Sequence, residues 1–229
     1  MILTVKNFSC YCMCTQYNVK GYYSVCNDFS YNFLSGTYIL QGEIDCGAWA
    51  FTDSISKKSK KCFVTIDPMS ELFVNDCNIS LKKLQKQVWC IDDKLSKKAS
   101  KVLMYDMIAV LSKKYKVDKS VDELLEKFGI PIKETAQFVI RPYSPYYPCY
   151  VALIGYLKGY KIFTASWHGQ IQFNKEVYEK IIRALQDEDC ILIIPSSEKN
   201  DFGKNCTYIK MISLFCEEAR RKYLGEELE

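Results

Sequence analysis

The sequence predicts one α/β domain with a mixed central sheet, an antiparallel strand-rich portion near the N-terminus and a helical subdomain at about residues 85–148. Two patterns predict this class. Short apolar runs typical of strands fill the first third, whereas apolar runs alternate with amphipathic helical segments in the second half. A strand–helix–strand rhythm needs a crossover and implies parallel pairing. Because 229 residues can bury a sizeable core, we expect residues 1–229 to form a single domain.

The strands of the first third are predicted from their alternation. Residues 3–9 alternate apolar and polar side chains, and residues 37–42 form a short apolar run. Residues 63–79 contain two apolar stretches around Asn75 and Asp76, which favour a tight turn. We therefore expect two strands followed by a further strand or a hairpin.

Two helices are predicted in the subdomain. From about residue 97 the apolar period changes, and one helix face should carry Leu103, Met107, Val110 and Leu111. In the next helix Ser120 and Glu123 have the spacing of a capping box. The apolar stripe of that second helix consists of Val121, Leu124, Leu125 and Phe128. Gly129 followed by Pro131 should end it.

The second half continues with a proline-rich stretch and a crossover. Residues 141–150 contain three prolines and should begin as non-helical backbone before an apolar helix. Residues 161–167 predict a strand, residues 174–185 an amphipathic helix and residues 190–195 a buried strand. These last three elements are the predicted parallel unit.

Composition favours an ordinary globular protein. Hydrophobic residues make up 48% and charged residues 25% of the chain, and the net charge is +4. We interpret the lysine clusters at 56–61 and 96–101 as solvated surface and expect no nucleic-acid partner. The opening residues show neither a signal peptide nor a membrane span, so we expect a cytoplasmic protein. Twelve scattered cysteines then favour free thiols.

The stretch GEIDCGAW at 42–49 raises the question of a phosphate site. A phosphate-binding loop reads G-x-x-x-x-G-K-[ST] between a strand and a helix, because backbone N–H groups, a lysine and a hydroxyl together hold phosphate and magnesium. Gly42 and Gly47 fit that spacing, but Ala48 takes the lysine position and Trp49 the Ser/Thr position. Taken alone, the two glycines could equally mark a plain tight turn.

The surroundings of this loop resemble the ATPase domains of ABC transporters. The match is carried by Phe29, Ser30, Phe33, Gly36, Leu40, Gly42 and Gly47. Residues 121–131 resemble the stretch before the family's signature motif, and residues 143–157 take the place of the signature and its helix. The matching residues there are Ser144, Val151, Ala152, Leu153 and Leu157. Residues 161–165 resemble the Walker B strand and residues 190–197 the last core strand. The resemblance implies the P-loop NTPase-like fold of ABC ATPases.

The resemblance also assigns candidate site residues. A degenerate nucleotide-binding loop would comprise Gly42, Asp45, Cys46, Gly47, Ala48, Trp49 and Ala50, with Tyr11 at the base-stacking position. A signature-like interface would comprise Tyr143, Ser144, Pro145, Tyr146 and Tyr147. The Walker-B-like pair would be Ser166 and Trp167.

Almost every chemical residue of the family is replaced. Ser166 and Trp167 stand where the family has an aspartate and the catalytic glutamate, and Pro145 and Tyr146 replace signature glycines. The family's glutamine falls at Asp92 or Asp93, and its switch histidine at Ser196 or Ser197. Since phosphoryl transfer depends on a lysine, a magnesium ion and a group that arranges water, we expect neither ordinary ATP affinity nor hydrolysis.

The resemblance therefore implies a non-hydrolysing structural or regulatory subunit of a transport complex. We expect no cofactor and no metal, with ATP and Mg²⁺ present only if the site retains binding. The expected partner is an active ABC ATPase subunit, a permease or a second copy of the chain. Contact with the inner face of the membrane would be peripheral, through such a partner.

Four alternatives stay open. The protein could be a working enzyme, either an atypical ATPase or a hydrolase that uses His168, its only histidine. It could instead bind a nucleotide base through Tyr11 without hydrolysis. Residues 142–150, rich in tyrosine, could form a binding surface or a packed loop. Four cysteines could be zinc ligands or, as we favour, free thiols: Cys10, Cys12, Cys14 and Cys26.

Overall fold

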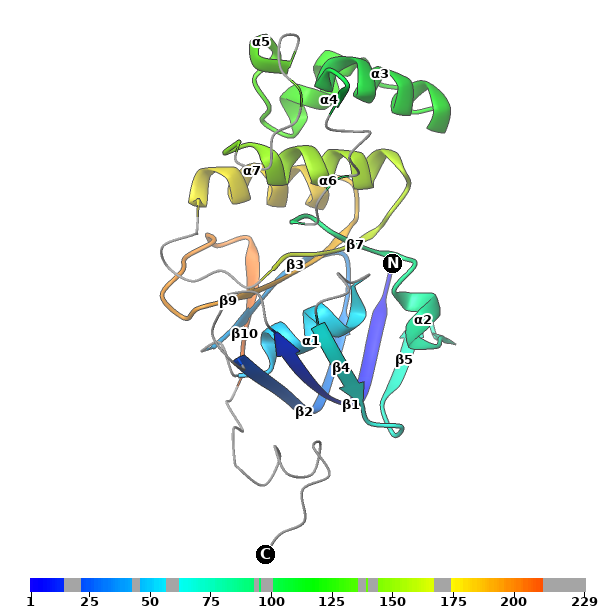
Figure 1. Ribbon diagram of the computed structural model, residues 1–229, viewed down its shortest axis with the longest axis vertical. Coiled ribbons are helices and arrows are strands. Elements are labelled where there is room, and N and C mark those ends of the chain that lie inside the picture. The colour runs from blue at the N-terminus through cyan, green and yellow to red at the C-terminus, as the bar shows by residue number, and fades with distance from the viewer. Residues whose placement is uncertain are drawn as a thin grey trace, which may run out of the picture.

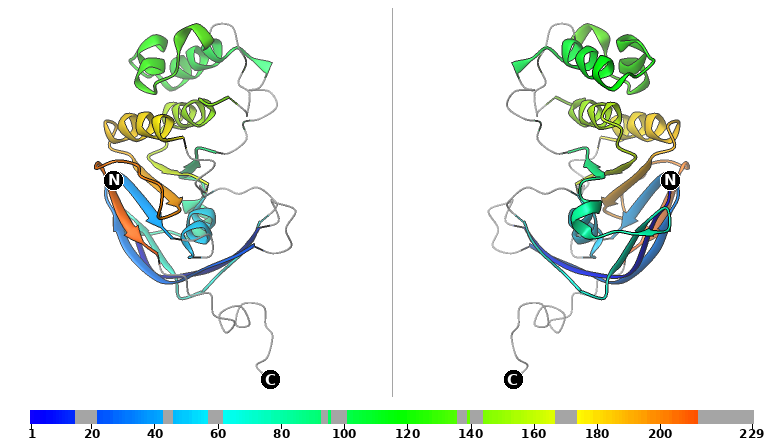
Figure 2. Two further views of the ribbon diagram at one scale, coloured as in Figure 1. Left: turned by 90° about the vertical axis from the view of Figure 1, so that its left-hand side faces the viewer. Right: turned by 90° about the vertical axis from the view of Figure 1, so that its right-hand side faces the viewer.

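The computed structural model describes most of the chain. The described residues are 1–14, 22–42, 46–56, 62–92, 95, 101–135, 139, 144–166 and 174–211. Figures 1 and 2 show a layered molecule: an antiparallel sheet at one end, then helix α1, a parallel sheet, helices α6 and α7, and helices α3 to α5 at the other end.

The antiparallel sheet is built from the first third of the chain. Its strands are β1 (Leu3–Cys14), β2 (Tyr22–Phe33), β4 (Cys62–Ile66), β5 (Glu71–Val74) and β6 (Cys77–Asn78). They pair in the order β2-β1-β5-β6, and β4 also pairs with β1. The predicted hairpin is confirmed, because Asn75 and Asp76 have φ of 47° and 62° and connect the antiparallel strands β5 and β6.

The second sheet is parallel throughout. Its order is β10 (Cys206–Lys210), β3 (Gly36–Gln41), β9 (Ile191–Ser196), β8 (Ile162–Thr164) and β7 (Val88–Cys90). The chain leaves β8, forms α7 (Lys175–Gln186) and returns as β9 beside β8, so the predicted crossover unit is confirmed. A mixed α/β architecture with one antiparallel and one parallel sheet is therefore present.

The parallel sheet separates two hydrophobic clusters. Ile191 and Ile193 of β9 belong to the cluster that surrounds α1 (Ala48–Ile55) between the two sheets. Leu192 and Ile194 belong to the other cluster, under the helices α3, α4, α6 and α7. Both faces of β9 are buried, which is why its sequence is a continuous apolar run rather than an alternating one.

The remaining helices cover the far face of the parallel sheet and one edge. They are α2 (Leu81–Leu84), α3 (Met104–Tyr115), α4 (Val121–Lys127), α5 (Ile132–Thr135) and α6 (Tyr147–Leu157). The capping box before α4 is confirmed: the Glu123 N–H donates to the Ser120 hydroxyl, and the Ser120 N–H donates to the Glu123 carboxylate. Gly129 ends this segment with a φ of 66°. No helix in the described ranges is long and apolar enough to span a membrane.

The predicted apolar face of α3 is wrong in part. Val110 is 64% exposed, and the buried positions of the helix are Met104, Ile108 and Ser112. These three lie four residues apart and form one stripe. Met107 and Leu111 of the predicted face are partly buried and pack against the same cluster, whereas Val110 faces outward, because α3 lies in the outermost layer (Figure 2).

Candidate functional site

The predicted site positions gather at one edge of the parallel sheet. Gly42 follows β3, Ser166 lies two residues after β8, and Ser196 ends β9. In open α/β sheets, ligands bind outside the carboxyl ends of the strands, where the strand order reverses. Here β3 lies between β9 and β10, which both come later in the chain. The loop after β3 therefore begins at the position where such a fold holds a ligand.

The loop start is tied to its neighbours by backbone hydrogen bonds. The Gly42 N–H donates to the Ser196 carbonyl at 3.0 Å, and the Met211 N–H donates to the Gln41 carbonyl at 2.7 Å. Gly42 has no room for a side chain, since a Cβ there would lie 2.5 Å from Cys46 Sγ and 2.9 Å from the Met211 carbonyl oxygen. The Cys46 side chain thus packs across the loop start. Residues 43–45, including Asp45, lie outside the described residues.

The loop end packs onto the antiparallel sheet. Gly47 has a φ of 88°, and a Cβ there would lie 2.4 Å from the Val25 carbonyl oxygen of β2. Helix α1 starts directly after it with Ala48, Trp49 and Ala50, all buried, and the Trp49 side chain lies in the hydrophobic cluster between the sheets. The two positions where a phosphate loop has lysine and a hydroxyl are therefore core positions in this fold.

A group of buried thiols lies where the loop meets the antiparallel sheet. Cys10 and Cys26 are cross-strand partners on β1 and β2, and Cys46 belongs to the same hydrophobic cluster. A hydrogen bond with the Cys10 thiol and burial together raise the pKa of Cys26 well above its usual value. Thiols held neutral in this way behave as small apolar side chains.

The end of β8 is fixed by a carboxylate. The Ser166 N–H donates to Asp92 Oδ2 at 2.7 Å, which connects the ends of β8 and β7. The same Asp92 carboxylate bonds the Tyr178 hydroxyl. Burial and this neighbouring carboxylate together raise the pKa of Tyr178. Asp92 at the family's glutamine position thus bonds two protein groups. Asp93 and Trp167 lie outside the described residues.

The serines at the switch-histidine position are also engaged. Asn200 Nδ2 donates to Ser196 Oγ at 2.8 Å, and the Lys199 N–H contacts Ser197 Oγ at 3.4 Å. Both serines are buried. Among the described side chains one buried hydroxyl, that of Thr164 in β8, has no hydrogen-bond partner. The edge therefore offers hydroxyl and amide groups where the family has ionisable ones.

The signature-like turn lies on the other face of the parallel sheet from α1 (Figure 2). Tyr147 is the first residue of α6 and is buried, and its hydroxyl accepts a hydrogen bond from the Leu95 N–H at 2.9 Å. Tyr146 lies under the Lys180 ammonium, with Nζ 5.7 Å from the ring centroid. The exposed member of the turn is Pro145, and Ser144 is half-buried. Tyr143 lies outside the described residues.

Two other sequence candidates cannot be placed as side chains. Tyr11 lies on β1 opposite Val25 and Thr65, and this backbone pairing is all that the structure describes of it. His168, the candidate base of the alternative hydrolase, lies outside the described residues. Neither residue is brought into the loop region by any described contact.

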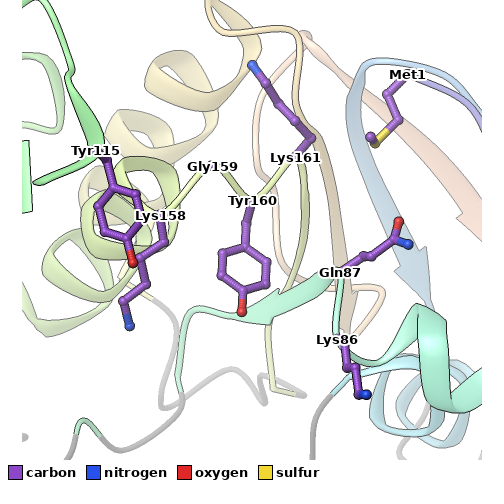
Figure 3. A pocket seen from close by; sticks show the side chains of 8 residues that line it. All are labelled: Met1, Lys86, Gln87, Tyr115, Lys158, Gly159, Tyr160 and Lys161. Carbon is purple, nitrogen blue, oxygen red and sulfur yellow. The ribbon is translucent and has the colours of Figure 1, made fainter.

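The sequence reasoning missed two hollows at the opposite edge, where the parallel strands begin. One has a volume of about 380 Å³ and lies beside the starts of β7 and β8 (Figure 3). The other, about 370 Å³, lies beside Gly36 at the start of β3. The signal that could have indicated the first is the recurrence of lysines just before two strands, at Lys86 and Lys161.

The solved structures that resemble this chain include several ATP-binding proteins of ABC transporters. An ABC transporter ATP-binding protein from Pyrococcus furiosus is 14% identical, with a TM-score of 0.57 and coverage of 92% of this chain and 98% of that one. The cbiO1 protein of Clostridium perfringens, part of the cbiONQ transporter complex, is 10% identical with a TM-score of 0.58, covering 99% and 95%. A dimeric ATP-binding cassette bound to ADP and phosphate is 13% identical with a TM-score of 0.56, covering 91% and 96%. No family model and no curated protein matches the sequence. The chain has the fold of the ATP-binding domains of ABC transporters.

Proposed function

We propose that this protein is a non-hydrolysing structural or regulatory subunit of a transport complex, built on the ATP-binding-domain fold. The observation that carries the proposal is the packing between β3 and α1. Cys46 lies against Gly42, Gly47 lies against β2, and Ala48 and Trp49 are core residues. All of these described contacts are made with other groups of the protein.

The loss of cationic groups argues against ordinary phosphate binding. A hydrogen bond to a charged group contributes about 1.5–3 kcal/mol, which is roughly a 10- to 150-fold change in affinity. Ala48 cannot make the contact that a lysine would make, and Trp49 offers no hydroxyl to a magnesium ion. The N–H groups at the start of α1 could still attract an anion weakly through the helix dipole, worth about 0.3–1 kcal/mol.

The chemistry at the neighbouring strand ends, those of β7 and β8, also argues against hydrolysis. Among the described residues, Asp92 is the carboxylate that hydrogen bonds connect to the ends of β7 and β8. It already accepts hydrogen bonds from the Ser166 N–H and the Tyr178 hydroxyl. Ser166 offers a hydroxyl with a very high pKa where a general base or a magnesium ligand would be needed. Phosphoryl transfer needs a cation to stabilise the transferred group and a group that arranges the water, and neither Ala48 nor Ser166 can take these roles.

The partner follows from the fold and from the missing chemistry. The structural neighbours include a subunit of a larger transporter complex and a nucleotide-bound dimer. By likeness, we propose that the chain works beside an active ATP-binding subunit, a permease or a second copy of itself. Its place would be the cytoplasmic face of the membrane, reached through that partner.

The experiment compares thermal unfolding of the purified protein with no ligand, with millimolar MgATP and with ATP in EDTA, together with phosphate release. A native-state ligand at 100 times its Kd adds about 2.7 kcal/mol of stability, which raises the Tm of a chain of this size by roughly 5–10 °C. We expect no magnesium-dependent rise and no phosphate release. Release that is lost in Asp92→Asn and kept in Glu198→Gln would contradict the proposal, since it would place catalysis at this edge.

A further inference from the structure

We infer that the hollow beside the starts of β7 and β8 is a binding site for a small phosphorylated anion. It lies at the amino ends of the parallel strands, on the opposite edge from the loop after β3, so it does not depend on the proposed function. Figure 3 shows the side chains that line it: Lys86 and Gln87 come from just before β7, Tyr160 and Lys161 from just before β8, and Lys158 from the end of α6. Tyr115, at the end of α3, closes one side.

Trp89 lies beside this hollow and holds two of its lining side chains in place. Its indole N–H donates to the Val151 carbonyl of α6 at 2.8 Å. Gly155 lets the ring approach α6, since a Cβ there would lie 2.4 Å from Trp89 Cδ1. The Tyr160 ring centroid is 4.9 Å from that of Trp89, and Lys158 Nζ is 4.5 Å from the Trp89 ring centroid. Two of the lining side chains are therefore held in place before any ligand arrives.

The charge of the hollow is positive. The described residues of its lining include Lys86, Lys158 and Lys161 and no carboxylate. Lys161 Nζ donates to the Glu188 backbone carbonyl at 2.6 Å, which is an uncharged acceptor and leaves the lysine charge in place. The C-terminal ends of α3 and α6 also meet here, and each contributes about −0.5 of a charge. The three lysine charges of the lining outweigh the partial charges of these two helix ends.

The chemistry of the lining selects the ligand class. Lysine ammonium groups bind phosphate as point charges, and charge-assisted hydrogen bonds are the stronger kind. The hydroxyls of Tyr115 and Tyr160 add neutral donors, and their rings offer surfaces on which a planar group could stack. A volume of about 380 Å³ lies within the range of small-molecule sites. Because the lysines among the described lining residues can themselves neutralise phosphate charge, binding should not require magnesium.

Isothermal titration in EDTA tests this with three probes: tripolyphosphate, ATP and adenosine. Tripolyphosphate and ATP should bind to the native chain, and adenosine should not. Lys86→Ala and Lys158→Ala should each weaken binding about tenfold, the loss expected for one charge-assisted contact. Lys199→Ala is the matched control: it removes an exposed lysine at the opposite edge and should leave the affinity unchanged. Tryptophan fluorescence is a second readout, because Trp89 contacts both Lys158 and Tyr160.

The outcomes separate the sources of the anion. Equal binding of ATP and tripolyphosphate supports a site for phosphate groups alone, and tighter ATP binding supports one that also stacks a base on tyrosine. The inference is overturned if neither phosphate compound binds, if adenosine binds as tightly as ATP, or if Lys199→Ala weakens binding as much as Lys158→Ala. None of these results requires magnesium or phosphate release, so they stand apart from the test of the proposed function.

Discussion

Glu188 offers the most direct test of what holds the outer helices to the sheet. Its carboxylate accepts hydrogen bonds from Lys119 before α4, from Lys127 in α4 at 2.6 Å and from Tyr156 in α6 at 2.9 Å. Only 17% of the Glu188 side chain is exposed. Glu188→Gln keeps the shape of the side chain and removes its charge. We expect the free energy of unfolding to fall, because two lysines then lose their common partner.

The magnitude follows from the pKa. Burial by itself would raise the pKa of Glu188, but the hydrogen bonds from Lys119, Lys127 and Tyr156 outweigh it and lower the pKa to about 2. Against about 4.3 in an unfolded chain, this corresponds to roughly 3 kcal/mol at 1.36 kcal/mol per pKa unit. Lys119 is partly exposed, and solvent screens such pairs. We therefore expect Glu188→Gln to cost about 2 kcal/mol at pH 7.

The sign of the pH dependence is fixed by the direction of this shift. A lowered pKa contributes stability above the unfolded value near 4.3, and that stability is lost as the pH falls toward 2. The difference between the native protein and Glu188→Gln should therefore be constant from pH 7 to pH 5. It should fall to about half near pH 3.

Urea unfolding followed by circular dichroism measures this difference at pH 7, 5 and 3. Glu198→Gln is the matched control, since Glu198 pairs with Lys210 at 3.3 Å on the surface and should contribute less than about 0.5 kcal/mol. Equal losses in Glu188→Gln and Glu198→Gln would refute the reasoning. A difference that does not change between pH 7 and pH 3 would refute the assigned pKa.

Three further substitutions test the packing, each by urea unfolding. Gly47→Ala should destabilise the protein by about 3 kcal/mol, because its φ is positive and the new Cβ would meet the Val25 carbonyl; a loss below 1 kcal/mol would mean that this contact relaxes. Ser120→Ala should cost about 1 kcal/mol through loss of the capping box, and Ser120→Asp, which can still cap, should restore most of it. Gly155→Ala should cost about 1–3 kcal/mol and change the tryptophan emission spectrum, because the new methyl displaces Trp89; an unchanged spectrum would argue against that.

The sequence predicted best those features that depend on local patterns. The capping box at Ser120 and the Asn75–Asp76 turn are each decided by neighbouring residues and were found as predicted. The strand predicted at residues 37–42 was found as β3, because an apolar run after a glycine is a local signal too. The parallel pairing of β8 and β9 followed from the crossover helix between them.

Features that depend on distant partners were not predicted. The short strands β7 and β10 exist because they pair with β8 and β3, and a three- or five-residue strand carries little periodicity of its own. Val110 was wrongly assigned to the buried face of α3, whereas Met107 and Leu111 pack against the core; Met104 and Ile108 are as apolar as Val110, so the pattern predicts a helix without fixing the centre of its buried side. Only the packing of α3 on α4 and α6 makes that choice.

The candidate site shows most clearly why residue identity alone does not settle function. Reading Ala48 and Trp49 as lost lysine and hydroxyl explains only what the loop cannot do. The structure adds that these residues, with Gly47 against β2, join α1 to both sheets. Burial of their apolar surface stabilises the fold by about 25 cal/mol per Å². The proposed loss of phosphate binding is thus compatible with retention of the fold, because Ala48 and Trp49 both contribute to the hydrophobic core.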